Sequence, residues 1–255
     1  MKIGIDHYTI QSKNLSVFQE LEYVLSKGLE GIQFVSPYDI SSSLDPGELA
    51  EVRAYADELE LYLEIGLPTV NPHYAGMDID EVVERVSNAL KASAEIGCRN
   101  QRTVLNAMHR FLSEEHGSKY VFDYHTDENH PGVSWPQQIE DSVKVLQRIA
   151  PIARDYDVRI CIEPHVDITT HDILRIIDKI GDDVIGVCLD TGNVIKRMED
   201  PVAATERVAP FTCLTHTKDA LFYPSANGFS WQCRPCGQGS IPVRDMLRIL
   251  YQHNP

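Results

Sequence analysis

Short apolar runs alternate with amphipathic stretches from one end of the chain to the other. The apolar runs are rich in Val, Ile and Leu and nearly continuous, which is typical of parallel strands covered on both faces. The amphipathic stretches repeat apolar residues at helical spacing. We predict strands over residues 2–9, 31–36, 61–68, 102–107, 159–164, 184–190 and 211–219. We predict helices over residues 15–27, 46–58, 79–96, 135–155, 170–180, 200–208 and 240–252.

Local signals mark several of the helix boundaries. Asp45 precedes Pro46, so we expect Asp45 to cap a helix that begins with proline. Gly28 follows the first helical stretch, where glycine commonly ends a helix. Repeated strand–helix units imply right-handed crossovers and a parallel sheet. Since no proline- or serine-rich linker divides the chain, we predict a single domain over residues 1–255.

The strand–helix alternation fits two architectures, and the segment after the first strand separates them. A nucleotide-binding doubly wound sheet carries a glycine-rich turn there, whereas "DHYTIQSKN" contains no glycine. A (β/α)8 TIM barrel fits the length and the alternation better. Only seven strands are predicted, so strand 8 of this α/β barrel is expected to be missing from the C-terminus of the chain.

Three consecutive predicted strands end in residues that commonly bind metal ions: Glu163, Asp190 and His216. In a TIM barrel the catalytic groups lie at the C-terminal ends of the strands. Each residue alone has an ordinary explanation, namely a salt bridge, a turn cap and a hydrogen-bonded core histidine. Together, two carboxylates and an imidazole suit Mn²⁺, Mg²⁺, Co²⁺ or Zn²⁺. The three residues together therefore predict a divalent metal site, and Mn²⁺ is the metal that we expect.

The segments "IEPHVDITT", "IGVCLDTGN", "THTKD" and "GQGSIP" resemble the sugar phosphate isomerase/epimerase superfamily, which has the xylose isomerase-like TIM barrel. The resemblance extends over nearly the whole chain and implies that Glu163, Asp190 and His216 are metal ligands. It also implies a fourth ligand, a glutamate on strand 8, yet the chain has no glutamate after Glu206. Either a C-terminal tail is absent from this sequence or the site is incomplete, and the helix-like "GQGSIPVRDMLRILYQHN" favours the former.

The resemblance implies a divalent-metal-dependent isomerase or epimerase that acts on a sugar or sugar derivative. The ion would polarise a carbonyl so that a base removes the proton from the adjacent carbon. By the same resemblance, Glu163 would serve as both ligand and acid/base group. The segment "IEPH" is similar to "IENH" in members that act on 3-oxo sugars, which makes His165 a second candidate base. Alternatively, Pro164 turns the chain and His165 merely caps the loop.

Further polar and aromatic residues near the strand ends are candidates for contacts with substrate. Epimerase relatives often have a histidine where this chain has Asn193, which weakens a strict ketose 3-epimerase assignment. Lys218 could bind a substrate oxygen or pair with Asp190 or Asp219. The expected loop 221–239 carries aromatic residues that could stack on a sugar, and the insert 109–132 could form a lid or a subunit contact. The substrate-binding candidates are His7, Arg102, Asn193, Lys218 and Trp231.

Composition narrows the class of partner. The formal net charge of −15 argues against a nucleic-acid binder, which needs clustered Lys and Arg. We expect a small carbohydrate substrate, a homo-oligomer or hetero-subunit assembly, and no membrane partner, because no apolar run is long enough to span a bilayer. Since the N-terminus lacks a secretory signal, we expect a cytoplasmic protein.

Three other functions remain open at this point. The first two are lyases on the same barrel, either a 3-oxo-glycoside C-deglycosylating subunit or a dehydroshikimate-type dehydratase. The third is a non-catalytic barrel subunit, which the lack of a strand-8 glutamate keeps open. A DNA-repair endonuclease would need more His and Asp/Glu ligands and a basic face, which the net charge disfavours.

Overall fold

The computed structural model describes residues 1–106, 112–113, 117–118, 133–165, 167–226 and 228–254. Within the predicted insert 109–132 it describes only a short antiparallel pairing of β5 (Leu112–Ser113) with β6 (Gly117–Ser118). The expectation of a lid or subunit contact over that insert therefore lies outside the described residues.

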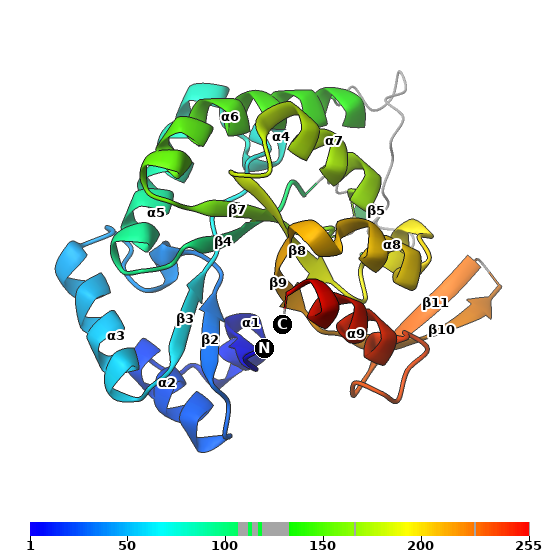
Figure 1. Ribbon diagram of the computed structural model, residues 1–255, viewed down its shortest axis with the longest axis horizontal. Helices are drawn as coiled ribbons and strands as arrows, with labels where there is room; N and C mark the ends of the chain where they lie inside the picture. Colours follow the sequence, from blue (N-terminus) through cyan, green and yellow to red (C-terminus); the bar gives the residue numbers. More distant parts are fainter. Residues whose placement is uncertain (107–111, 114–116, 119–132, 166, 227, 255) are drawn as a thin grey trace.

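Seven parallel strands form the wall of an incomplete barrel (Figure 1). One sheet has the order β1-β2-β3 and the other the order β4-β7-β8-β9. The two sheets meet where the amide of Leu67, just past β3, donates to the carbonyl of Arg102 on β4 at 2.6 Å. The strands are β1 (Ile5–Asp6), β2 (Gly31–Phe34), β3 (Tyr62–Ile65), β4 (Asn100–Thr103), β7 (Arg159–Ile162), β8 (Ile185–Asp190) and β9 (Thr212–His216).

The barrel is open on one side, between β9 and β1. In the part of the chain that the structure describes, no strand pairs with either of these edges inside the barrel wall. This arrangement confirms the predicted α/β barrel with seven strands and a gap at the eighth position. The open side leads into a cavity of about 1080 Å³, lined by Ile3 near the N-terminus, Leu250 near the C-terminus and the inward side chains of the strands.

Helices cover the outside of the barrel, as Figure 1 shows. The predictions for 46–58, 135–155 and 170–180 match the observed bounds because polar caps fix the ends. Asp45, for example, accepts from the amide of Glu48. The long helices are α2 (Val17–Ser26), α3 (Pro46–Glu58), α5 (Ile79–Glu95), α6 (Trp135–Asp155), α7 (Thr170–Ile180), α8 (Pro201–Val208) and α9 (Val243–His253). Shorter helical segments are α1 (His7–Ile10), α4 (Pro72–Ala75), η1 (Gln11–Lys13), η2 (Pro37–Asp39), η3 (Val194–Arg197) and η4 (Ala209–Phe211).

Several predicted ends differ by a few residues, as for the strand predicted over 102–107 and observed as β4 (Asn100–Thr103). Two predicted segments differ more. The first strand ends at Asp6, because the Asp6 side chain caps α1 by accepting from the amide of Tyr8 at 2.7 Å. The expected loop 221–239 is largely a β-hairpin of β10 (Asp219–Ser225) and β11 (Gly228–Arg234). Aromatic residues favour strands and cross-strand pairing. Here Phe222 and Trp231 are register partners whose ring centroids lie 6.0 Å apart.

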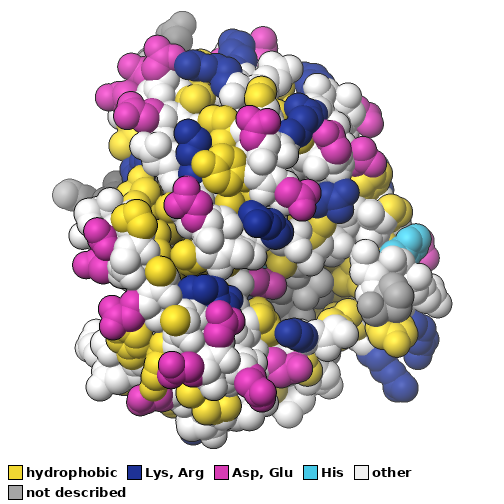
Figure 2. Space-filling model, turned by 60° about the vertical axis from the view of Figure 1, so that its left-hand side comes forward, with side chains coloured by type: hydrophobic (Ala, Val, Ile, Leu, Met, Phe, Trp, Pro, Cys, Tyr) yellow, Lys and Arg dark blue, Asp and Glu magenta, His cyan; other side chains and the backbone are white. Residues whose placement is uncertain are grey.

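The surface carries charged side chains of both signs. Acidic and basic side chains are interspersed over the face shown in Figure 2, with apolar side chains between them. Among the described residues, no helix is both long enough and apolar enough to cross a bilayer.

Candidate active site and metal centre

The predicted ligands lie at the C-terminal ends of three neighbouring strands. Glu163 directly follows β7, while Asp190 of β8 and His216 of β9 are register partners. Side chains alternate across a strand, so the inward layer below them holds Cys161, Cys188 and Leu214, which form one buried cluster. Polar groups thus occupy the upper layer of the barrel interior and apolar groups the next.

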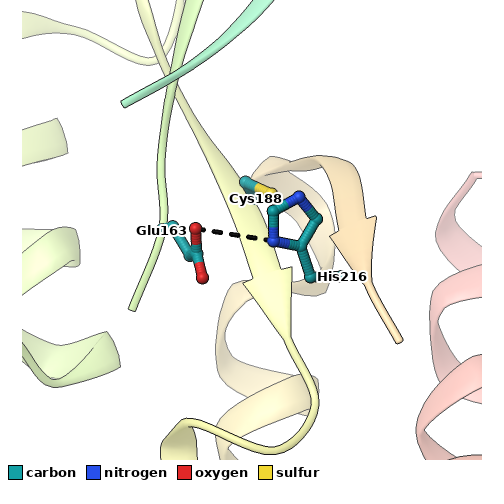
Figure 3. A group of neighbouring side chains, drawn as sticks. All are labelled: Glu163, Cys188 and His216. Carbon is teal, nitrogen blue, oxygen red and sulfur yellow. Dashed lines mark ion pairs between the residues drawn. The ribbon is translucent and has the colours of Figure 1, made fainter. Parts of the chain in front are cut away.

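Glu163 is fully enclosed, and three side chains surround its carboxylate. Arg102 Nε donates to Oε2 in a buried ion pair. Asn193 Nδ2 donates to Oε1 at 3.1 Å, and His216 Nδ1 lies 3.5 Å from Oε2 (Figure 3). Burial alone would raise the pKa of Glu163, but the charges of Arg102 and His216 outweigh it and hold that pKa well below its ordinary value. Glu163 is therefore ionised at neutral pH.

The surroundings of His216 fix which ring nitrogen carries a proton. Nε2 lies 2.6 Å from Gln33 Oε1 and 3.6 Å from Asp6 Oδ2. Gln33 Nε2 in turn donates to Glu64 Oε2 at 3.0 Å. Because both neighbours of Nε2 are acceptors, Nε2 carries a proton. Nδ1 faces the Glu163 carboxylate.

Asp190 is held by a turn and by a lysine. Its Oδ1 accepts from the backbone amides of Gly192 and Asn193, each at 2.9 Å. Its Oδ2 forms an ion pair with Lys218 Nζ at 2.5 Å. Burial, and next the nearby charge of Glu163, raise the pKa of Asp190 above its ordinary value, while Lys218 opposes them. The same pairing raises the pKa of Lys218, against the effect of burial.

The structure thus brings most of the predicted site residues together. Arg102, Asn193 and His216 each contact Glu163, and Asp190 pairs with Lys218 beside them. His165 lines the same cavity, and its Nδ1 is buried without a hydrogen-bond partner among the described residues. Burial lowers the pKa of His165 to about 4, although Glu163 opposes the shift.

Two predicted substrate-binding residues lie apart from this cluster. His7 Nδ1 pairs with Glu20 Oε2 of α2 at 2.9 Å, and its ring packs against Phe34. Trp231 belongs to the β10–β11 hairpin, where Lys196 Nζ lies 3.5 Å from the centre of its ring. Neither residue is among those that line the cavity, and each has a partner within the protein, so their roles in substrate binding remain predictions.

The residues at the strand ends fit a divalent cation in donor type and charge. Glu163, Cys188 and His216 present ligand atoms within 4.8 Å of one another (Figure 3). Asp190, the third predicted ligand, is not part of this group. Burial raises the pKa of Cys188 well above its ordinary value, so it stays a thiol and a weak ligand. Carboxylate and imidazole ligands bind such ions at about 2.0–2.2 Å, which Glu163 Oε2 and His216 Nδ1 can satisfy together.

The charge of the contact network agrees with that fit. It contains four carboxyl groups and two basic side chains, a formal charge of −2 when all are ionised, and burial raises the pKa of Glu64 and of Asp190. One divalent ion would neutralise it. The carboxyl groups are Asp6, Glu64, Glu163 and Asp190, and the cations are Arg102 and Lys218.

Gln33 and Glu64 belong to this network although the sequence patterns did not single them out. Each is the polar residue inside an otherwise apolar strand segment, "GIQFVS" and "LYLEIG". That departure from apolar character was the available signal, because a buried polar side chain needs a partner.

Comparisons with known proteins place the chain in a family. Residues 21–254 match the xylose isomerase-like TIM barrel family. The chain is 24% identical over 193 residues to the 3-oxo-isoapionate decarboxylase of Pectobacterium atrosepticum, a match that covers 75% of this chain and 57% of that protein. The matched part of the chain therefore spans little more than half the length of this curated relative.

Solved structures share the fold at low sequence identity. The probable 3-DHS dehydratase AsbF of petrobactin synthesis from Bacillus anthracis is 14% identical, with a TM-score of 0.70 over 100% of this chain and 90% of that one. A D-psicose 3-epimerase from Clostridium cellulolyticum H10 is 14% identical, with a TM-score of 0.69 over 94% and 76% of the two chains. From the match over residues 21–254, the chain belongs to the xylose isomerase-like TIM barrel family.

Proposed function

We propose that this protein is a divalent-metal-dependent enzyme that moves a proton on the carbon next to the carbonyl of a sugar or sugar derivative, as an isomerase or epimerase. The observation that carries the proposal is the pair of Glu163 Oε2 and His216 Nδ1, 3.5 Å apart at the C-terminal ends of the strands. The family match and the likeness to proteins named as epimerases support it.

In this proposal Glu163, Asp190 and His216 hold the ion, with Mn²⁺ as the expected metal. When bound, the ion supplies Lewis acidity that polarises a carbonyl and acidifies the neighbouring C–H group. Arg102 and Asn193 fix the Glu163 carboxylate, so it meets the ion at little cost in side-chain entropy. Asp190 would hold the ion from its place beside Lys218, whose ammonium would bind a substrate oxygen.

We assign His165 as the base that removes the proton from carbon and returns it. It lines the cavity, is separated from Glu163 by Pro164 alone, and keeps Nδ1 free of hydrogen bonds within the described part of the chain. A neutral imidazole with an unused lone pair can accept a proton from carbon and return it. The cavity of about 1080 Å³ is large enough for a monosaccharide derivative. The acid/base role expected of Glu163 remains a prediction.

The test is exchange of the carbon-bound proton with solvent. The protein would be incubated with Mn²⁺ in D₂O with a panel of ketohexoses and 3-oxo sugars, and loss of the proton next to the carbonyl followed by NMR. We expect exchange on at least one substrate, and we expect Glu163→Gln and His165→Gln each to slow it by about 100-fold or more. Glu95→Gln, on the exposed surface of α5, is the matched control. Exchange that persists unchanged in Glu163→Gln would refute the proposal.

A second candidate is a lyase that acts on a 3-oxo sugar acid. The name of the 24% identical relative, a decarboxylase, favours this reaction, as does the unpartnered Nδ1 of His165. Bond cleavage next to a carbonyl would use the same ligands and the same stabilised carbanion. Release of CO₂ or of a leaving group from the panel, without recovery of an isomer, would identify this alternative.

A further inference from the structure

We propose that Gln33 and Glu64 are positioning residues that form a relay to His216 and hold its ring with Nε2 protonated and Nδ1 directed at the metal site. The inference rests on the proposed function only in taking His216 as a ligand. The relay itself, Glu64 to Gln33 to His216 Nε2, is a matter of side-chain contacts across the barrel.

Glu64 determines the direction of each hydrogen bond in the relay. Glu64 offers carboxylate oxygens, so the amide nitrogen of Gln33 faces Glu64 and donates to Oε2 at 3.0 Å. The amide oxygen of Gln33 then faces the ring, where it accepts from His216 Nε2 at 2.6 Å. A reversed amide would leave the Gln33 oxygen against the oxygens of Glu64, which costs free energy in a buried site. The chain of contacts therefore keeps a proton on Nε2 and turns Nδ1 toward Glu163.

Backbone pairing aligns the first two members of the relay but not the third. Gln33 of β2 and Glu64 of β3 are register partners, so their side chains leave the sheet side by side. His216 belongs to β9, which pairs with β8 and, in the described residues, has no partner on the side of β1. The contact between Gln33 and His216 joins residues 183 positions apart across this open side. The ring is thus oriented from β2 by a side chain, not by its own strand's neighbours.

Partners of this kind affect metal binding measurably. Hydrogen bonds to the distal nitrogen of a ligating histidine fix its tautomer and orientation, and their loss typically costs 10–100-fold in metal affinity. Asp6 Oδ2, 3.6 Å from Nε2, is too distant for a hydrogen bond, so among the described residues Gln33 is the hydrogen-bond partner of that nitrogen. Gln33 is 6% exposed, so water cannot readily replace it at the ring.

The first test reads the tautomer without any metal. Long-range ¹H–¹⁵N NMR spectra of ¹⁵N-histidine-labelled protein distinguish a ring protonated on Nε2 from one protonated on Nδ1, and a His216→Asn variant assigns the signal. We expect wild type to show the Nε2–H pattern. Gln33→Met, which keeps the size of the side chain but removes the acceptor, should shift His216 toward a mixture. An unchanged pattern in Gln33→Met would overturn the relay.

The second test titrates Mn²⁺ into the full chain by calorimetry. Gln33→Met should weaken Mn²⁺ binding by about 10–100-fold. Glu64→Gln should also weaken Mn²⁺ binding, because it frees the Gln33 amide to turn. The loss should be smaller than in Gln33→Met, which removes the acceptor altogether. The double exchange Gln33→Glu with Glu64→Gln restores one acceptor facing the ring and one donor behind it, so it should recover most of the affinity. If the double exchange does not recover Mn²⁺ affinity although His216 keeps its Nε2 proton, the direction of the hydrogen bonds does not control metal binding. That result would contradict the relay.

A matched control separates positioning from simple destabilisation. Gln101 is a fully buried glutamine on β4 whose amide donates to the carbonyls of Leu90 and Cys98. Gln101→Met should lower the unfolding temperature yet leave Mn²⁺ affinity and the His216 tautomer unchanged. Should Gln33→Met fail to fold, the double exchange and Glu64→Gln still test the relay. Wild type that binds no Mn²⁺ but shows the Nε2–H pattern would refute the proposed metal site and leave the relay standing.

Discussion

At the scale of single residues, the central feature is a carboxylate buried at a strand end with a full set of partners. Glu163 is 1% exposed, and a charge at that depth is tolerated only when it is paired and hydrogen-bonded. Arg102 and Asn193 meet that requirement from β4 and from the turn after β8. The cost of burial is thus offset by neighbours that also orient the carboxylate toward His216.

Replacing Arg102 by leucine tests this dependence. At pH 7 the variant leaves the Glu163 charge buried and unpaired, so we expect it to lower the free energy of unfolding by about 3–5 kcal/mol in chemical denaturation. The wild-type pKa of Glu163 is depressed by folding, so the contribution is fully present above the unfolded value of about 4.3 and is lost as pH falls. The deficit of Arg102→Leu should therefore shrink in acid.

The exposed ion pair of Arg154 with Asp183, 2.7 Å apart, provides the control. Arg154→Leu should cost less than about 1 kcal/mol, because solvent screens a pair of this kind. Equal losses in the two variants would show that burial of Glu163 does not depend on Arg102.

At the scale of elements, the sequence predicts the order and kind of the barrel strands and main helices but not their partners across the barrel. Caps such as Asp45 and periodic apolar faces are local signals, so helix ends such as those of α3 could be placed. The contact of Gln33 with His216 spans 183 positions, and no local pattern reports it. His7 shows the same limit, because its position after a strand could not reveal that it faces Glu20 of α2.

The junction of the two sheets gives an element-scale prediction. A side chain at Gly66 would place its first carbon 2.3 Å from the carbonyl oxygen of Val35 and 3.3 Å from that of Arg102, and backbone cannot easily yield. Gly66→Ala should therefore lower the free energy of unfolding by about 2–3 kcal/mol, measured by denaturant titration. Gly47→Ala, in the first turn of α3, meets only the flexible Asp45 side chain and should change stability by less than about 1 kcal/mol. A neutral Gly66→Ala would contradict the close approach of the Gly66 backbone to Val35 and Arg102.

At the scale of the whole molecule, an acidic protein places two cations beside the carboxylates of its candidate site. The net charge is −15, yet the buried Arg102 pairs with Glu163 and the partly exposed Lys218 pairs with Asp190. Carboxylates still outnumber these cations in the contact network, which favours a bound divalent ion. The same arrangement leaves the interior polar and accessible through the open side, as a site for a small hydroxylated substrate requires.

The most direct measurement of this account is the Mn²⁺ stoichiometry of the metal-stripped, reconstituted protein, read by calorimetry and by metal analysis after desalting. The account predicts one ion per wild-type chain, with binding lost or weakened at least 100-fold in Glu163→Gln and in His216→Asn, while the surface variant Glu95→Gln binds like wild type. No bound ion in the wild type, or an ion that both site variants hold as tightly as the wild type does, would contradict it.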